Sequence, residues 1–124
     1  MESVDKSTSG EETAKELDQI VARLQPIFER RGVRRAILFG SFARGEPSRR
    51  SDIDLLVVQR TDKRWLDRYD AILREVVEAV RGRDVEMLIY TPDELQGMSD
   101  THFVATVLRE GKTIYESDEE SPPG

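Results

Sequence analysis

The chain has 124 residues, of which 37% are hydrophobic and 35% are charged, and its formal net charge is −6. A chain of this length has room for one compact domain with a single hydrophobic core. The absence of cysteine excludes disulfides, thiolate zinc sites and cysteine nucleophiles, and a single histidine cannot build a histidine metal cluster.

The negative charge is concentrated at the two ends of the chain. Residues 1–12 carry four acids and one lysine, and residues 116–124 carry four acids and no base. Both segments are poor in large apolar residues, so we expect disordered acidic tails around one folded domain over residues 13–115. That domain holds 18 basic and 17 acidic residues, and its near neutrality argues against a nucleic-acid partner.

The sequence contains no signal for a membrane or for export. No apolar run approaches the ~20 residues that span a bilayer, and the first residues lack the basic and then apolar pattern of a signal peptide. We therefore expect a cytoplasmic protein without a membrane partner.

The first third of the chain predicts a helix, a strand and a loop. Apolar residues recur at three-to-four spacing from Glu12 to about Arg31, which indicates an amphipathic helix that Pro26 should kink or split. Val33 to Phe39 is typical of a short buried strand. Residues 40–51 contain two glycines, a proline and three serines, and this composition favours a loop that can hold one helical turn.

The next segment, Asp52 to Gln59, alternates with the period of a strand. Its apolar residues fall on one face, while Asp52 and Asp54 fall on the other, so the two carboxylates point the same way.

The remaining elements continue the alternation of helix and strand. Thr61 or Asp62 can cap a helix with a broad apolar stripe, formed by Trp65, Leu66, Tyr69, Ile72, Leu73, Val76, Val77 and Val80. A strand over residues 84–90 follows, then a helix start at Thr91-Pro92, a helix over residues 99–110 and a strand over residues 112–115. The fold class is α/β, with a small mixed sheet packed against helices.

Gly40 and Ser41 stand where the buried strand ends, and they suit an anion. Without a Cβ at Gly40, phosphate oxygens can approach the peptide N–H groups, and the Ser41 hydroxyl can donate a further hydrogen bond. A short helix that begins near Ser41 would direct its first amides at the same anion. This arrangement predicts a triphosphate site.

Asp52 and Asp54 predict a metal ion beside that site. Two carboxylates held side by side repel each other, and Mg²⁺, a hard cation that prefers oxygen ligands, removes this penalty. The alternative is that Asp-x-Asp is only the solvent face of an edge strand; the Gly-Ser turn at the end of the preceding strand favours the metal site.

The pattern Gly40-Ser41, ten residues and then Asp52-x-Asp54 resembles the signature of the minimal nucleotidyltransferases of the DNA polymerase beta superfamily. The flanking residues 38–45 and 51–55 also resemble the family motif, as does the stretch from Arg109 to Tyr115. The resemblance covers about residues 14–115 and implies the polymerase-beta-like fold.

The resemblance also implies roles for the site residues. The Gly-Ser turn would bind the triphosphate of an NTP, and the Asp-x-Asp pair would bind Mg²⁺. A third carboxylate on a neighbouring strand would complete the metal site and help to deprotonate the attacking hydroxyl. Glu86 stands at that position, where the family usually has aspartate, and we assign the role to it; Asp84, which faces the same way, is the competing candidate. Arg44 and Ser51 lie within the motif and could contact phosphate or only steady the loop.

The predicted activity is transfer of NMP, AMP from ATP in our interpretation, to a hydroxyl group. The family implies two acceptor classes: a protein, as for antitoxins that adenylylate HEPN-type toxins, or a small molecule, as for aminoglycoside nucleotidyltransferases. A chain without a second domain must borrow its acceptor surface from a partner or an oligomer, which favours a protein acceptor. The glutamate at position 86 keeps a third hypothesis open, a non-catalytic antitoxin that binds its partner and retains a residual nucleotide site.

Overall fold

The computed structural model, which describes residues 2–44, 52–60 and 70–117, has a four-stranded sheet at its centre. The strands are β1 (Val33–Phe39), β2 (Ile53–Gln59), β3 (Val85–Tyr90) and β4 (Lys112–Glu116), and their order across the sheet is β3-β2-β1-β4. β1 is antiparallel to both β2 and β4, whereas β2 and β3 are parallel. The predicted mixed sheet is therefore confirmed.

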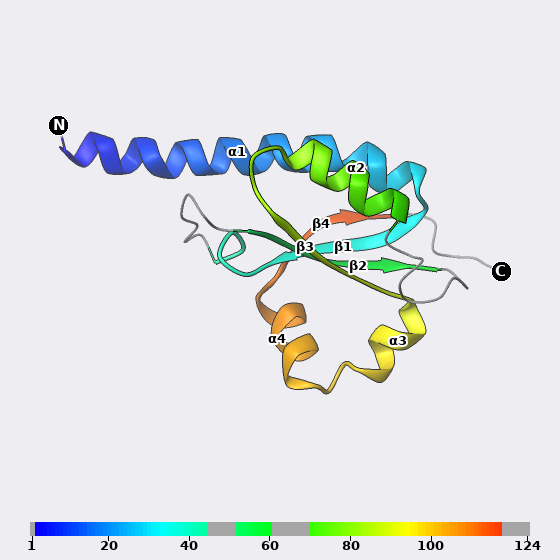
Figure 1. Cartoon of the computed structure of the whole chain (residues 1–124). Coiled ribbons are helices and arrows are strands. Elements are labelled where there is room, and N and C mark those ends of the chain that lie inside the picture. The colour runs from blue at the N-terminus through cyan, green and yellow to red at the C-terminus, as the bar shows by residue number, and fades with distance from the viewer. Residues whose placement is uncertain (1, 45–51, 61–69, 118–124) are drawn as a thin grey trace.

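Helices cover both faces of this sheet (Figure 1). α1 (Glu2–Arg30) and α2 (Asp70–Val80) lie on one face, and α3 (Pro92–Gly97) and α4 (His102–Glu110) lie on the other. α2 lies in the connection between the parallel strands β2 and β3, which a tight turn cannot join.

The alternation of side chains along β2 divides the core in two. Ile53, Leu55 and Val57 belong to the larger apolar cluster, which contains residues of α1 and α2. Leu56 and Val58 belong to the smaller cluster, which contains Val107 of α4 and adjoining residues of α3. Asp52 and Asp54 have the parity of this second group, so the two acids lie on the α3–α4 face of the sheet.

The first helix is longer and more continuous than the sequence suggested. α1 begins at Glu2, so residues 2–12, which we expected to be disordered, are helical. Packing of the later turns supplies the nucleus from which a helix extends at little cost. The helix also continues through Pro26, because this proline is exposed while Leu24, Ile27 and Phe28 are buried beside it. Burial of the apolar face outweighs one missing hydrogen bond on the solvent side.

The later boundaries follow the predicted capping residues. Thr91 and Glu94 form a capping box at the start of α3, as the Thr-Pro pattern predicted. α4 begins later than residue 99, because the Thr101 hydroxyl accepts a hydrogen bond from the Val104 amide and acts as the N-cap.

Other boundaries differ from the predictions by a residue or cannot be compared. β3 begins at residue 85 and β4 extends to residue 116. The predicted caps Thr61 and Asp62, and the predicted apolar residues Trp65, Leu66 and Tyr69, lie outside the described residues. Among the described helices, none is both long and apolar enough to cross a membrane.

Candidate active site

Three carboxylates from two neighbouring strands converge at one end of the sheet. Asp52 directly precedes β2, and Asp54 on β2 is the register partner of Glu86 on the parallel strand β3. Carboxylate oxygens of the three residues lie within 4.8 Å of one another. Asp52 and Asp54 are partly buried and Glu86 is exposed, which leaves the cluster open to solvent on the β3 side.

The competing candidate, Asp84, lies outside this cluster in the part of the chain that the structure describes. It precedes β3, and its backbone oxygen accepts a hydrogen bond of 2.9 Å from the Ile53 amide. The structure thus gives Asp84 a backbone role at the start of the β2–β3 ladder and brings Glu86 to the two aspartates.

Burial and mutual repulsion together disfavour negative charge on this cluster. Burial, and then the nearby charges of Glu86 and Asp52, raise the pKa of Asp54 from 3.8 to about 6, and Arg44 opposes this shift only weakly. The three carboxylates repel one another when all are ionised, and a hard divalent cation bound between them would offset this repulsion. Such a cation would also lower the pKa of Asp54 again. The three carboxylates could therefore hold a metal ion.

Gly40 lies directly against this cluster. Its φ of +80° is a conformation that favours glycine, and a Cβ at this position would overlap Oδ2 of Asp54. Sequence reasoning attributed the glycine to close approach of phosphate. The structure adds that the absent side chain leaves space for the Asp54 carboxylate.

A single helical turn follows Gly40, because the Arg44 amide donates a 3.1 Å hydrogen bond to the Gly40 oxygen. Such a turn leaves its first amides without intrahelical partners, as a phosphate site requires. Ser41 is partly buried within the turn, whereas Arg44 is exposed and its side chain adds positive charge near Asp54. Ser51, the other predicted nucleotide contact, lies outside the described residues.

Sequence reasoning missed the residues that hold this turn in place. Phe42, in the middle of the turn, is only 2% exposed and packs in the larger apolar cluster. The guanidinium of Arg83 lies over its ring, 4.7 Å from the centroid. Glu16 of α1 fixes Arg83 through two hydrogen bonds of 2.7 and 3.2 Å. The three residues come from distant segments of the chain. The only sequence feature that pointed to this contact was the aromatic residue Phe42 within the motif.

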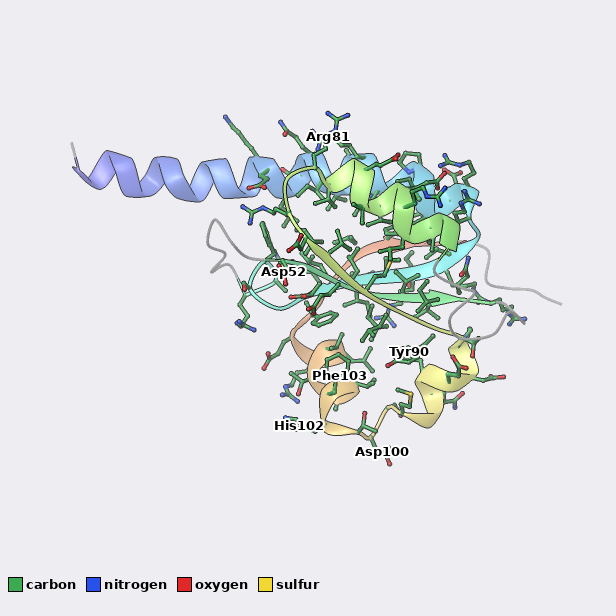
Figure 2. All side chains as sticks on the ribbon, viewed as in Figure 1. Asp52, Arg81, Tyr90, Asp100, His102 and Phe103 are labelled. Atoms are coloured by element: carbon green, nitrogen blue, oxygen red, sulfur yellow. The ribbon has the colours of Figure 1, made fainter. Side chains whose placement is uncertain are left out.

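An aromatic pair adjoins the other side of the cluster. Phe39, the last residue of β1, is the register partner of Asp54, and its ring makes an edge-on contact with Phe103 of α4 at 5.6 Å between centroids. Figure 2 shows Phe103 on α4 and Asp52 beside the sheet. Phe103 is 43% exposed, so α4 places a partly open aromatic ring against Phe39, the neighbour of Asp54 in the sheet.

The raised pKa of Asp54 predicts the pH dependence of metal binding. Mg²⁺ affinity should fall as the pH decreases through about 6, by up to about tenfold for each pH unit below it, because a protonated Asp54 is not a ligand. Calorimetric titrations with Mg²⁺ between about pH 5 and pH 8 would measure this fall. An affinity that stays constant over this range would contradict the assignment of Asp54 as a ligand.

The Arg83 contact predicts a positioning effect on the turn. Arg83→Met keeps the aliphatic stem but removes both the ring contact and the ion pair with Glu16, so the Kd for ATP, the nucleotide that the sequence motif implies, should rise by about tenfold, which corresponds to about 1.4 kcal/mol. Calorimetric titration with ATP would measure this rise.

Arg31→Met is the matched control for Arg83→Met. Arg31 also forms a two-bond ion pair from an arginine to a glutamate, with 3.1 Å hydrogen bonds to Glu75, but this pair is exposed and does not contact Phe42. The control should leave the Kd for ATP unchanged, and an equal rise in both variants would mean that Arg83 acts only through general stability.

Comparison with known proteins agrees with this geometry. The family model described as "Polymerase beta, Nucleotidyltransferase" matches residues 22–120. Two proteins of Methanocaldococcus jannaschii, each named "Putative protein adenylyltransferase", are similar to the chain. MJ0435 is 39% identical over 74 residues, which are 60% of this chain and 77% of that protein. MJ1305 is 34% identical over 85 residues, 66% of this chain and 58% of that protein, so the chain spans little more than half of MJ1305.

A solved structure shares the fold. It is a crystal structure of a toxin-antitoxin with AMP-PNP, and it matches with a TM-score of 0.55 and 20% sequence identity over 75% of this chain and 70% of the matched one. At this level of identity, the likeness concerns the arrangement of helices and strands.

Proposed function

The chain belongs to the polymerase beta nucleotidyltransferase family, and on that basis we propose that it transfers AMP from ATP, in the presence of Mg²⁺, to a hydroxyl group of a partner protein. The observation that carries the proposal is the convergence of Asp52, Asp54 and Glu86 beside the turn that starts at Gly40. Two relatives with names that specify protein adenylyltransferases favour a protein acceptor.

In the proposed mechanism, Asp52 and Asp54 hold Mg²⁺ together with Glu86. The bound ion supplies charge neutralisation for the phosphates and for the charge that develops at phosphorus. The turn at Gly40 and Ser41 directs backbone amides and one hydroxyl towards the triphosphate, and Arg44 adds a cation at its edge. These groups orient the nucleotide so that its α-phosphorus faces the incoming hydroxyl.

Glu86 accepts the proton of the attacking hydroxyl. The hydroxyl oxygen forms a new bond to the α-phosphorus, the bond from that phosphorus to the bridging oxygen breaks, and pyrophosphate leaves. Glu86 suits this role because it is the most exposed of the three carboxylates, at the side from which a large acceptor can approach. An acceptor that carries its own folded surface compensates for the small size of this domain.

We further propose that the acceptor is a HEPN-type toxin, and that the chain acts as its antitoxin. The sequence motif resembles the antitoxins that modify such toxins, and the fold is similar to that of a chain in a toxin-antitoxin crystal structure. Modification of a hydroxyl on the toxin would inactivate the toxin enzymatically.

The proposal predicts that the native partner gains one or more AMP groups. The purified chain, ATP, Mg²⁺ and a HEPN-type partner would be incubated, and intact-mass measurement should show an added mass of about 329 Da per transfer, ATP less pyrophosphate. The heat-denatured partner should remain unmodified, because docking orients the acceptor hydroxyl.

Two results would contradict the proposal in different ways. Labelling of an aminoglycoside, with no modification of the partner, would assign a small-molecule acceptor. Tight binding of the partner without modification, and without stabilisation of the chain by ATP and Mg²⁺, would assign a non-catalytic antitoxin.

A further inference from the structure

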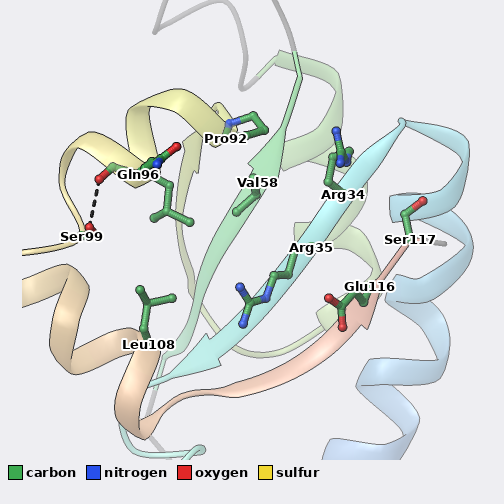
Figure 3. Close-up of a pocket in the computed structure, with 10 residues that line it drawn as sticks. Arg34, Arg35, Val58, Pro92, Gln96, Ser99, Leu108, Glu116 and Ser117 are labelled. Carbon is green, nitrogen blue, oxygen red and sulfur yellow. Dashed lines mark hydrogen bonds between the residues drawn. The ribbon is translucent and has the colours of Figure 1, made fainter. Parts of the chain in front are cut away.

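A cavity of about 320 Å³ lies on the same face of the sheet as the carboxylates but at the other end of the strands (Figure 3). Its floor includes Val58 of β2, four residues beyond Asp54, which places it about 13 Å from the cluster at the usual rise per strand residue. Residues of α3 and α4 form its walls, and the end of β4 closes one side. None of the three clustered carboxylates lines it.

Arg35 is the unusual residue of this cavity. It lies on β1, an inner strand of the sheet, and shares a face with Ile37 and Phe39, where strand alternation calls for apolar side chains. Its Nε atom is buried and has no hydrogen-bond partner among the described residues. Figure 3 shows the Arg35 side chain directed into the cavity, with Leu108 and Glu116 on either side.

The acid opposite Arg35 on the neighbouring strand forms no ion pair with it in the described part of the chain. Glu116 is the register partner of Arg35 on β4 and also lines the cavity, yet the two side chains form no ion pair within the described part of the chain. A buried donor on a charged group that lacks an acceptor costs free energy, and a bound ligand that supplies an acceptor would remove this cost.

The walls define the rest of that ligand. Val58 is 5% exposed on the floor, and Pro92, Leu95 and Leu108 contribute apolar surface around the guanidinium. The volume is at the lower end of the range for small-molecule pockets, about 300–1,000 Å³. A guanidinium pairs best with the two oxygens of a planar anion.

We propose that this cavity binds a small organic acid, with its carboxylate on Arg35 and its apolar body against Val58, Leu95 and Leu108. The site is separate from the nucleotide and metal site, and the proposal does not depend on the transfer reaction.

Three probes, of which the first two match in size and shape, test the proposal on the unmodified full chain by calorimetry or by ligand-observed NMR. Isovalerate has both the carboxylate and the apolar body, isovaleramide has the same shape without the charge, and acetate has the carboxylate alone. Isovalerate should bind with a millimolar Kd, while isovaleramide and acetate should bind at least about tenfold more weakly, a loss of about 1.4 kcal/mol. Binding of isovaleramide as tight as that of isovalerate would overturn the proposal. So would the absence of isovalerate binding.

Variants locate the binding. Arg35→Gln removes the unpaired charge and should abolish isovalerate binding, whereas Arg74→Gln, an exposed arginine on α2 at the other face of the sheet, should leave it unchanged. Glu116→Gln removes the competing carboxylate and should tighten binding severalfold. Retention of binding in Arg35→Gln would overturn the assignment, and the comparison of probes on the unmodified chain keeps the test valid if that variant does not fold.

Discussion

Asp54→Asn is expected to lower kcat/KM for AMP transfer by at least about 10²–10³-fold and to leave the metal-free protein folded. The magnitude is that of removing one preorganised group that stabilises transition-state charge. An asparagine side chain keeps the shape of the aspartate but not its negative charge, and a neutral amide oxygen binds Mg²⁺ much more weakly than a carboxylate does. Asp52→Asn should have a similar effect, and transfer assays with circular dichroism would separate lost activity from lost fold.

Asp84→Asn is the matched control, because Asp84 is also an acid beside β2 but lies outside the cluster. It should retain most of the activity, whereas Glu86→Gln should lose more, since that change would remove both a proposed metal ligand and the proposed proton acceptor. The opposite ranking of these two variants would transfer the role of third carboxylate to Asp84.

The sign of the stability change in Asp54→Asn follows from the raised pKa. In the metal-free folded chain, the pKa of Asp54 lies at about 6 rather than 3.8, so the folded state holds this proton more tightly than the unfolded state. The stability from protonation is complete below pH 3.8 and is lost as the pH rises through about 6. The metal-free variant should therefore match the parent near pH 4 and exceed it in thermal stability above pH 6. A variant that is less stable than the parent at pH 7 would contradict this account.

The members of the cluster were predicted from the sequence: the family resemblance assigned the third carboxylate to Glu86, and the structure brings Glu86 to Asp52 and Asp54. Strand periodicity places Asp52 and Asp54 on one face without any knowledge of the fold. The choice between Asp84 and Glu86 depends on the register of two strands that a helical crossover separates. The pairing of Asp54 with Glu86 is a property of the β2–β3 ladder, which local sequence cannot specify.

The supporting contacts were beyond prediction for a related reason. Arg83 and Glu16 are 67 residues apart in the sequence. They meet beside Phe42 because α1 packs against the sheet close to the segment that precedes β3. The expected kink at Pro26 is also absent, because the buried residues on either side of the proline keep α1 continuous. The fold class could be predicted from the alternation of apolar residues and from the capping residues. The residues that hold the site in place could be identified only in the folded structure.

Gly40→Ala is expected to abolish Mg²⁺ binding and transfer while the fold survives. The new Cβ would meet Oδ2 of Asp54, and Cγ and Cβ of the same residue lie 3.2 and 3.5 Å from it. Because the obstructing atom is the end of a side chain, Asp54 can rotate away and the backbone can stay in place. That rotation removes the carboxylate from Asp52 and Glu86, so activity should fall about as far as in Asp54→Asn.

Gly32→Ala separates this effect from backbone strain. Gly32 has a φ of +73°, close to the +80° of Gly40, but a Cβ there would meet no atom within 4 Å. Both substitutions should cost roughly 1–2 kcal/mol of stability through the left-handed conformation. Only Gly40→Ala should lose Mg²⁺ binding, measured by calorimetry, together with AMP transfer. If Gly40→Ala binds Mg²⁺ as well as Gly32→Ala does, the Asp54 carboxylate has no fixed place in the metal site, and the contact between Gly40 and Asp54 is only a feature of packing.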